Sequence, residues 1–94
     1  MPMTIWKFSL PYGAVPARTI MIPRGAIMLD VQMQNGQPQV WALVEPHRPP
    51  VERRLLIYGT GHEVPDYLTK TMHVGTFQDG GYVFHVFDGG EVTT

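Results

Sequence analysis

Apolar and polar side chains alternate along several short stretches of the chain, and no stretch sustains the apolar period of about 3.6 residues that marks a helix. Alternation predicts strands, because successive side chains of a strand point to opposite faces of a sheet. In residues 27–34 the side chains of Ile27, Leu29, Val31 and Met33 alternate with their neighbours, which predicts one buried face. Further strands are predicted over residues 4–10, 18–22, 40–45, 53–58, the latter part of 67–78, and 82–87.

Turn-forming residues separate these stretches. Nine prolines and ten glycines divide the chain, as is typical of proteins built from strands and turns. Asn35 and Gly36 both favour positive φ, so they predict a tight hairpin turn between residues 27–34 and 40–45. A short helical turn is expected, if anywhere, in residues 65–72. The predicted fold class is therefore all-β, a small antiparallel sheet or barrel of six to seven short strands.

The chain has room for one domain. Its 94 residues bury only about 60–70% of the unfolded surface, so association between copies would add stability. Residues 1–87 are expected to form a single β domain, and residues 88–94 a flexible C-terminal tail. The predicted strands 40–44 and 82–87 are apolar on both faces, which favours central positions or contact with a second copy. A homo-oligomer is the expected assembly.

Composition excludes several classes of function. The net charge is −1 with only seven lysines and arginines, whereas duplex binding depends on several cation–phosphate contacts. The chain has no cysteine, so disulfide frameworks, thiolate zinc sites and cysteine nucleophiles are excluded. No secretory signal pattern and no apolar run of about 20 residues is present. We therefore expect a cytoplasmic protein with no membrane and no long nucleic acid as partners.

The four histidines lack the spacing of known catalytic or metal-binding motifs. A two-histidine phosphoesterase needs His-x-Thr or His-x-Ser, which none of them begins, and Ser9 is the only serine, without a nucleophile-elbow turn. The sequence therefore predicts a protein that is not an enzyme and that uses neither a metal nor a cofactor. His85, between two apolar neighbours, is either a satisfied core histidine or faces a cleft together with His62.

Candidate chemistry gathers in the turn that follows residues 53–58. Gly59 and Gly61 bracket Thr60, and His62 comes next. Two glycines let another group approach the backbone closely, and exposed N–H groups beside a hydroxyl and an imidazole are the parts of a small anion site. The other interpretation, that the turn only reverses the chain, remains open at this point.

Neighbouring cations and aromatics extend this candidate ligand site. Arg53 and Arg54 cannot both serve one pocket, because adjacent strand residues point to opposite faces. Arg54 shares its predicted face with Tyr58, so this pair is expected near the ligand, with Arg54 supplying charge to a phosphate. Tyr58 or Trp41 would stack on a base. The predicted ligand-binding residues are thus Arg54, Tyr58, Gly59, Thr60, Gly61, His62 and Trp41.

Several runs of the sequence resemble a family of short, single-domain proteins encoded mainly by bacteriophages. The resemblance extends over residues 4–87, and it carries no catalytic motif. Its most specific parts are Gly59-Thr60-Gly61-His62 and Val83-Phe84-His85-Val86-Phe87. The other matching runs are Ile5-Trp6-Lys7-Phe8, Ile20 to Ala26, Leu29-Asp30-Val31-Gln32, Val40 to Val44, Tyr58 to Pro65, and Gly75-Thr76-Phe77-Gln78.

The resemblance implies a setting in which phage proteins act against the host. One such class, the phage sponge proteins, holds cyclic nucleotide signals between the subunits of an oligomer. The expected function is therefore a non-enzymatic counter-defence protein that binds and sequesters a cyclic nucleotide or another phosphorylated small molecule. The alternative is a protein–protein inhibitor of a host factor or a virion accessory protein. A nucleotide hydrolase or lyase is a third, weaker possibility.

Overall fold

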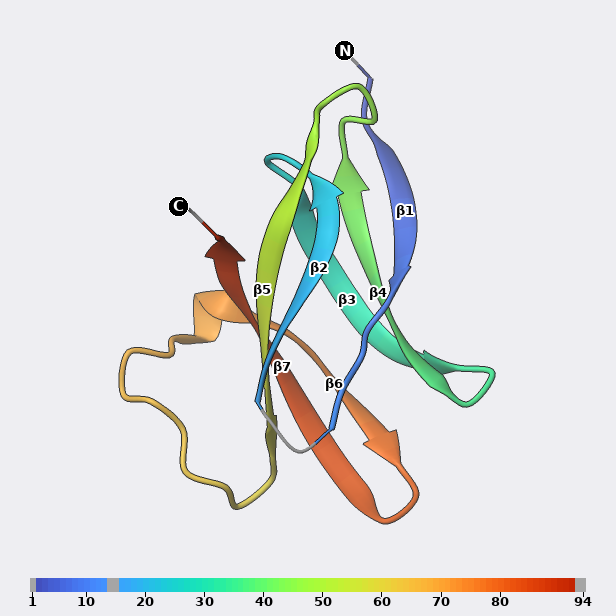
Figure 1. Cartoon of the computed structure of the whole chain (residues 1–94). Coiled ribbons are helices and arrows are strands. Elements are labelled where there is room, and N and C mark those ends of the chain that lie inside the picture. The colour runs from blue at the N-terminus through green and yellow to red at the C-terminus, as the bar shows by residue number, and fades with distance from the viewer. Residues whose placement is uncertain (1, 14–15, 93–94) are drawn as a thin grey trace.

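The computed structural model describes residues 2–13 and 16–92 and is all-β (Figure 1). A single 3₁₀ turn, η1, lies in the segment where the sequence allowed a helical turn. The elements in chain order are β1 (Thr4–Ser9), β2 (Ala17–Pro23), β3 (Ile27–Gln34), β4 (Gln37–Val44), β5 (Pro50–Gly59), η1 (Lys70–Met72), β6 (His73–Asp79) and β7 (Tyr82–Glu91).

The seven strands form two antiparallel sheets. One has the order β1-β4-β3, and the other has the order β2-β5-β7-β6. The β3–β4 hairpin turns through Asn35 and Gly36, whose φ angles are 54° and 78°, as the sequence predicted. The strands that are apolar on both faces, β4 and β7, are each flanked by two neighbours in their sheets, which is one of the two positions expected for them.

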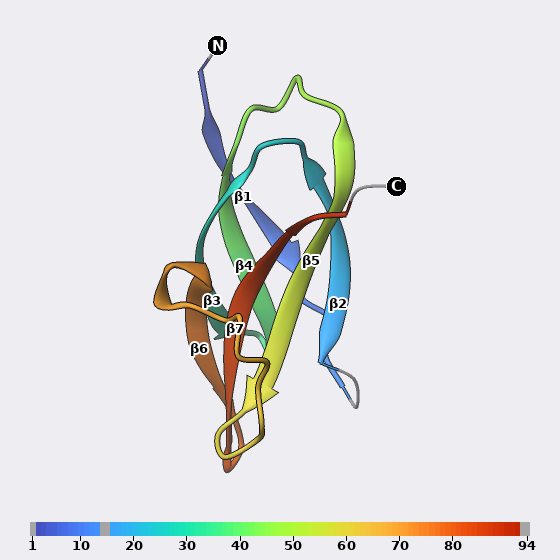
Figure 2. The same cartoon turned by 90° about the vertical axis from the view of Figure 1, so that its left-hand side faces the viewer.

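The core lies between the facing sides of the two sheets (Figure 2). Ile22, Val31, Val40, Leu55 and Val86 are fully buried, and they come from both sheets. Each large aliphatic side chain removed from water in this way contributes about 1.5–3 kcal/mol. Over residues 2–13 and 16–92, no helix is long and apolar enough to cross a membrane.

The alternation predicted for residues 27–34 is interrupted in the structure. A register shift lies between Met28 and Asp30, so the strand carries a β-bulge. Met28 and Met33 pack against the core, whereas Ile27 and Leu29 are exposed. The prediction that Ile27 and Leu29 share the buried face with Val31 is therefore wrong, because the inserted residue reverses which side of the strand faces the core.

The predicted tail is also wrong over residues 88–91. β7 continues to Glu91, and the Asp88 carboxylate accepts hydrogen bonds of 2.8 and 2.6 Å from the Arg53 guanidinium. Glu91 accepts a hydrogen bond of 2.6 Å from the Gly25 N–H. These contacts tie the end of β7 to β5 and to the β2–β3 turn. Residues 93–94 of the predicted tail lie outside the described residues.

Candidate functional site

The turn after β5 is held by its own backbone. The Thr60 N–H donates to the Val83 carbonyl at 3.0 Å, and the His62 N–H donates to the Gly59 carbonyl at 3.1 Å. Gly61 has a φ of 89°, which favours glycine. Because the N–H groups of Thr60 and His62 already have partners, these two groups are not free to bind an anion, and the contacts predicted at Gly59 and Gly61 stay predictions. The Thr60 bond extends the β5–β7 pairing by one residue.

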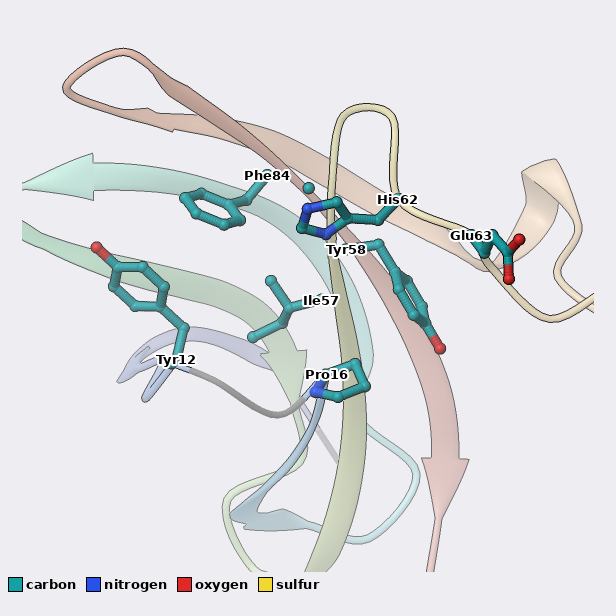
Figure 3. Close-up of a pocket in the computed structure, with 9 residues that line it drawn as sticks. Tyr12, Pro16, Ile57, Tyr58, His62, Glu63 and Phe84 are labelled. Atoms are coloured by element: carbon teal, nitrogen blue, oxygen red, sulfur yellow. The ribbon is translucent and has the colours of Figure 1, made fainter.

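Gly59 has a second role, which is to make room for the imidazole of His62. A Cβ placed on Gly59 would stand 2.9 Å from His62 Cε1 and 3.1 Å from Nδ1. The imidazole therefore lies against the backbone of Gly59. Figure 3 shows the ring between the side chains of Phe84 and Tyr58.

His62 separates two hollows at this end of the molecule. The first has a volume of about 230 Å³ and is bordered by Tyr12, Tyr58 and Ile57. The second, about 310 Å³, is bordered by Thr60, Tyr82 and Val83. Gly59, His62 and Phe84 line both. Each volume is near the lower end of the range for ligand sites, so either hollow suits one planar ring rather than a whole dinucleotide.

Aromatic side chains shape the walls of these hollows. The Tyr12 and Phe84 rings meet edge to face at 5.4 Å, and Tyr82 and Phe84 lie 6.4 Å apart. The Tyr12 hydroxyl donates to the Asp79 carboxylate, a bond that, with burial and the nearby negative charge, raises the pKa of Tyr12. Burial, followed by the effect of Tyr67, raises the pKa of Tyr58. Both phenols therefore stay neutral at physiological pH.

A chain of hydroxyls and imidazoles begins at Thr60 and crosses the outward side of the four-stranded sheet. Thr60 Oγ1 lies 2.7 Å from His85 Nε2, and His85 Nδ1 lies 3.1 Å from Thr76 Oγ1. Thr76 Oγ1 in turn lies 3.2 Å from His73 Nε2. A hydroxyl both donates and accepts, so this chain accommodates either tautomer of His85.

An aromatic row runs beside this chain on the same outward side. The Tyr58 and Phe87 rings are 6.4 Å apart, and the Phe87 and His73 rings are 5.3 Å apart. Residues 60–72 lie outside the four-stranded sheet, in front of β5 and β7 in Figure 2. The outward side of β5, β7 and β6 thus combines polar donors with apolar rings.

His85 and His62 do not share a cleft. His62 lines the hollows with Phe84, and Phe84 packs against the core, whereas consecutive residues of β7 point to opposite sides. His85 therefore lies on the outward side. Of the two interpretations offered by the sequence, a hydrogen-bonded histidine is the one observed, although its partners are hydroxyls at the surface rather than groups in the core.

The structure brings Tyr58, Gly59, Thr60, Gly61 and His62 together, as their sequence positions require. Two further candidates lie elsewhere. Arg54 is four residues before Tyr58 on β5, about 13 Å away along an extended strand, where it borders a separate hollow with Gly89 and Gly90. Trp41 belongs to β4 of the other sheet. Neither residue is placed at the turn.

Arg53 is a structural cation. Its guanidinium contacts the carboxylates of Asp88 at 2.6 Å and Glu91 at 3.8 Å. The hydrogen bond to Asp88 is the main cause that raises the pKa of Arg53, against the opposing effect of burial. Arg48, which lies in the loop before β5, pairs with Glu45 at 2.5 Å. The cations expected near the turn are therefore engaged elsewhere or distant from it.

Sequence reasoning missed Thr76, His73, Tyr82 and Phe84 as members of the site. One signal was available for Thr76, because a two-residue turn at Gly80 and Gly81 places it directly opposite His85. No sequence signal predicted that His73 belongs to the site. A register shift lies between His73 and Gly75, so counting residues back from the turn does not place His73.

Within the described part of the chain, no three histidine, aspartate or glutamate residues are grouped so that they could hold a metal ion. A family model described as a domain of unknown function, DUF7352, matches residues 1–93. No curated protein and no solved structure matches the chain.

Proposed function

The chain belongs to the DUF7352 family, and we propose that it is a non-enzymatic binding protein that sequesters a small phosphorylated ligand of the nucleotide class. The site of this binding is the hollow of about 310 Å³ beside His62, together with the hydroxyl–imidazole chain that begins at Thr60. Action against a host signal in phage infection, which the sequence resemblance implies, is the biological setting that we propose for it.

One observation carries the proposal: the aromatic hollow and the polar chain meet at Thr60. Thr60 lines the hollow with Tyr82 and Phe84, and its hydroxyl lies 2.7 Å from His85 Nε2. A planar base would stack on one of these aromatic side chains, since aromatic rings bind bases through stacking. A phosphate attached to that base would then reach the Thr60 hydroxyl and the imidazoles, which donate hydrogen bonds to anions.

The distribution of charge supports a ligand of low charge. His62, His73 and His85 are the potential cations at the site, and among the described residues none of the three lies within 4.0 Å of a carboxylate oxygen. Their hydrogen-bonding capacity is directed to hydroxyls and to the hollow instead. A mononucleotide or cyclic nucleotide suits this arrangement better than a long polyanion, which depends on many cationic contacts.

Catalysis is the second candidate, because Thr60 and His85 have the contact of a nucleophile and its base. The distance of 2.7 Å is within the range of an activated hydroxyl. The third group, however, is the Thr76 hydroxyl at 3.1 Å rather than a carboxylate that would stabilise an imidazolium. Two N–H groups of the turn are also already bonded, so they are not free to stabilise an oxyanion. Binding is therefore the function that we propose.

The test measures thermal unfolding against mono-, cyclic di- and cyclic trinucleotides and against inorganic phosphate. A ligand at 100 times its Kd adds about 2.7 kcal/mol, which moves the midpoint of a domain of this size by several degrees. We expect a selective shift that is lost in Thr60→Val, which keeps the shape of the side chain and removes the hydroxyl.

Arg54→Ala is the matched control, because Arg54 is on the same strand but distant from the turn. We expect it to retain the full shift. Loss of the shift in Arg54→Ala but not in Thr60→Val would overturn the site. A panel without any shift would reject the ligand class and favour a protein partner, and conversion of a nucleotide by the wild type but not by His85→Ala would establish the catalytic alternative.

A further inference from the structure

The two hollows at the end of β5 have part of their lining in common. Gly59, His62 and Phe84 line both the first hollow, of about 230 Å³, and the second hollow, of about 310 Å³. The His62 imidazole lies against the Gly59 backbone, between the side chains of Phe84 and Tyr58 (Figure 3). One imidazole is therefore the partition between two spaces that are each large enough for one planar ring.

Each hollow has an aromatic wall of its own. Tyr12 and Tyr58 border the first hollow, whereas Tyr82 borders the second. Phe84 stands between them, with its ring centroid 5.4 Å from that of Tyr12 and 6.4 Å from that of Tyr82. Because aromatic rings bind bases by stacking, each hollow offers one base a surface of this kind.

Charge distinguishes the two hollows. Among the described residues that line the first hollow, Glu63 is the one acidic or basic side chain apart from His62. A phosphate in that hollow would therefore face a like charge. The described lining of the second hollow has the Thr60 hydroxyl and no acidic side chain, and a hydroxyl donates hydrogen bonds to anions. The first hollow therefore suits an uncharged base, and a phosphate suits the side of Thr60 and His62.

The ring nitrogens of His62 have no hydrogen-bond partner among the described residues, which distinguishes it from the two other histidines of the site. His85 is bonded to Thr60 and Thr76, and His73 is bonded to Thr76. An imidazole N–H donates to anions. The exposed His62 is thus able to bind a phosphate that passes from one hollow to the other.

We propose that the two hollows bind the two bases of one dinucleotide, whose linking phosphate passes over His62. This inference rests on the proposed function and narrows its ligand class. One base stacks beside Tyr82 in the second hollow, and the other stacks beside Tyr58 in the first. The linking phosphate accepts a hydrogen bond from His62 at the partition. A mononucleotide would fill one hollow and leave the other to water.

A linked ligand fills both hollows more readily than two separate mononucleotides do. A second mononucleotide would lose its own translational and rotational freedom, and its phosphate would lie near the Glu63 carboxylate. A base tethered through its neighbour avoids both effects, because the link holds it at a high effective concentration. A third base would find no further place in these two hollows, so a trinucleotide should gain little over a dinucleotide.

Isothermal titration calorimetry of the whole chain compares adenosine, guanosine, cytidine and uridine 5′-monophosphates with the matched linear and cyclic dinucleotides. We expect at least one dinucleotide to bind about tenfold tighter than its mononucleotide, the scale on which one further stacked base contributes, with one dinucleotide bound per chain. Equal affinities in every matched set would overturn this inference and leave the proposed function intact. One dinucleotide per two chains would also overturn it, because the second base would then be held by another copy. No binding of any nucleotide would reject both proposals.

Tyr58→Leu tests which hollow holds the second base. It removes the aromatic ring from the first hollow and keeps an apolar side chain beside Phe87, whose ring lies 6.4 Å from that of Tyr58. We expect about tenfold weaker binding of the dinucleotide and no change for the mononucleotide. Tyr67→Leu is the matched control and should change neither affinity, because Tyr67 is 60% exposed and is not among the described residues that line the hollows. Equal weakening of both ligands by Tyr58→Leu, or equal effects of the two variants, would contradict the inference.

A dinucleotide with an uncharged methylphosphonate link tests the position of the phosphate. The wild type should bind it about tenfold more weakly than the natural dinucleotide, the scale of a charge-assisted hydrogen bond, whereas His62→Ala should bind the two alike. His47→Ala, in the loop between β4 and β5, is the control and should keep the wild-type preference. A preference that survives in His62→Ala would place the linking phosphate elsewhere and reject the arrangement.

Discussion

The imidazole of His62 occupies its position because Gly59 has no side chain. His62 Cε1 occupies the space 2.9 Å from a Cβ added there, and the ring borders both hollows. The imidazole is at the end of an exposed side chain, so it is able to swing away. A side chain added at residue 59 would then change the geometry of the site, with little change in the free energy of unfolding.

Gly59→Ala is therefore expected to displace His62 while it changes the free energy of unfolding by no more than an ordinary surface substitution does, about 0.5 kcal/mol. Nuclear Overhauser contacts from the His62 ring to Phe84 report the displacement, and thermal unfolding reports stability. Gly81→Ala is the control, because a Cβ there meets no atom within 4 Å. An unmoved His62 ring in Gly59→Ala would contradict this account of the glycine.

Two strands from different sheets approach closely at Gly75. An added Cβ on this residue of β6 would stand 2.8 Å from Val31 Cγ1 and 3.1 Å from the Val31 backbone nitrogen in β3, and 2.7 Å from Asp30 Oδ1. Backbone is unable to move aside as a side-chain end does. The contact between the sheets along β3 and β6 thus depends on a residue without a side chain.

Gly75→Ala is expected to lower the free energy of unfolding by about 1–3 kcal/mol, the usual cost of inserting atoms into packed structure. Urea unfolding of this variant is compared with that of Gly81→Ala. Both substitutions restrict the unfolded chain to the same degree, so their difference isolates the effect of crowding. Equal stabilities would show that β3 and β6 separate without cost.

At the level of elements, the sequence predicted most strands because alternation and turn residues act locally. It failed where a contact between strands decides the outcome. The composition of a flexible tail is found in Asp88, Gly89 and Gly90, yet the Arg53 guanidinium binds the Asp88 carboxylate. A Cβ added to Gly89 would stand 3.2 Å from the Arg54 carbonyl oxygen, so the absence of a side chain there lets β7 lie close to β5.

The same distinction applies to the candidate site. The contiguous residues Tyr58 to His62 were predictable because a turn keeps them together. The chain from Thr60 through His85 and Thr76 to His73 was not, because it joins β6, β7 and the turn after β5. Arg54 was assigned to the site from its strand face alone, and a shared face does not bring residues to the same end of a strand.

At the scale of the whole molecule, an ionic cluster fastens the end of β7 to the rest of the fold. Arg53 contacts Asp88 and Glu91, and Glu91 also accepts the Gly25 N–H from the turn that leads into the other sheet. Burial acts to raise the pKa of Asp88, but hydrogen bonds from Arg53 and the Gly90 N–H, with the charge of Arg53, lower it overall. The ionised form of Asp88 therefore stabilises the folded state.

The sign of the pH dependence follows from that lowered pKa. The contribution is fully present above the unfolded pKa of about 3.9 and is lost as the pH falls through the lower folded pKa. Asp88→Asn should reduce the free energy of unfolding by about 1.5–3 kcal/mol at neutral pH, the scale of charge-assisted hydrogen bonds.

The difference between the wild type and Asp88→Asn should then narrow as the pH is lowered from about 4, because the wild type also becomes protonated there. Urea unfolding at a series of pH values measures this convergence. Glu63→Gln, in the exposed loop after the turn, serves as the matched control and should show no such trend. A difference that stays constant from neutral to strongly acidic pH would mean that Asp88 acts through its shape alone. Convergence would instead establish that the charge on Asp88 holds the last strand in the sheet.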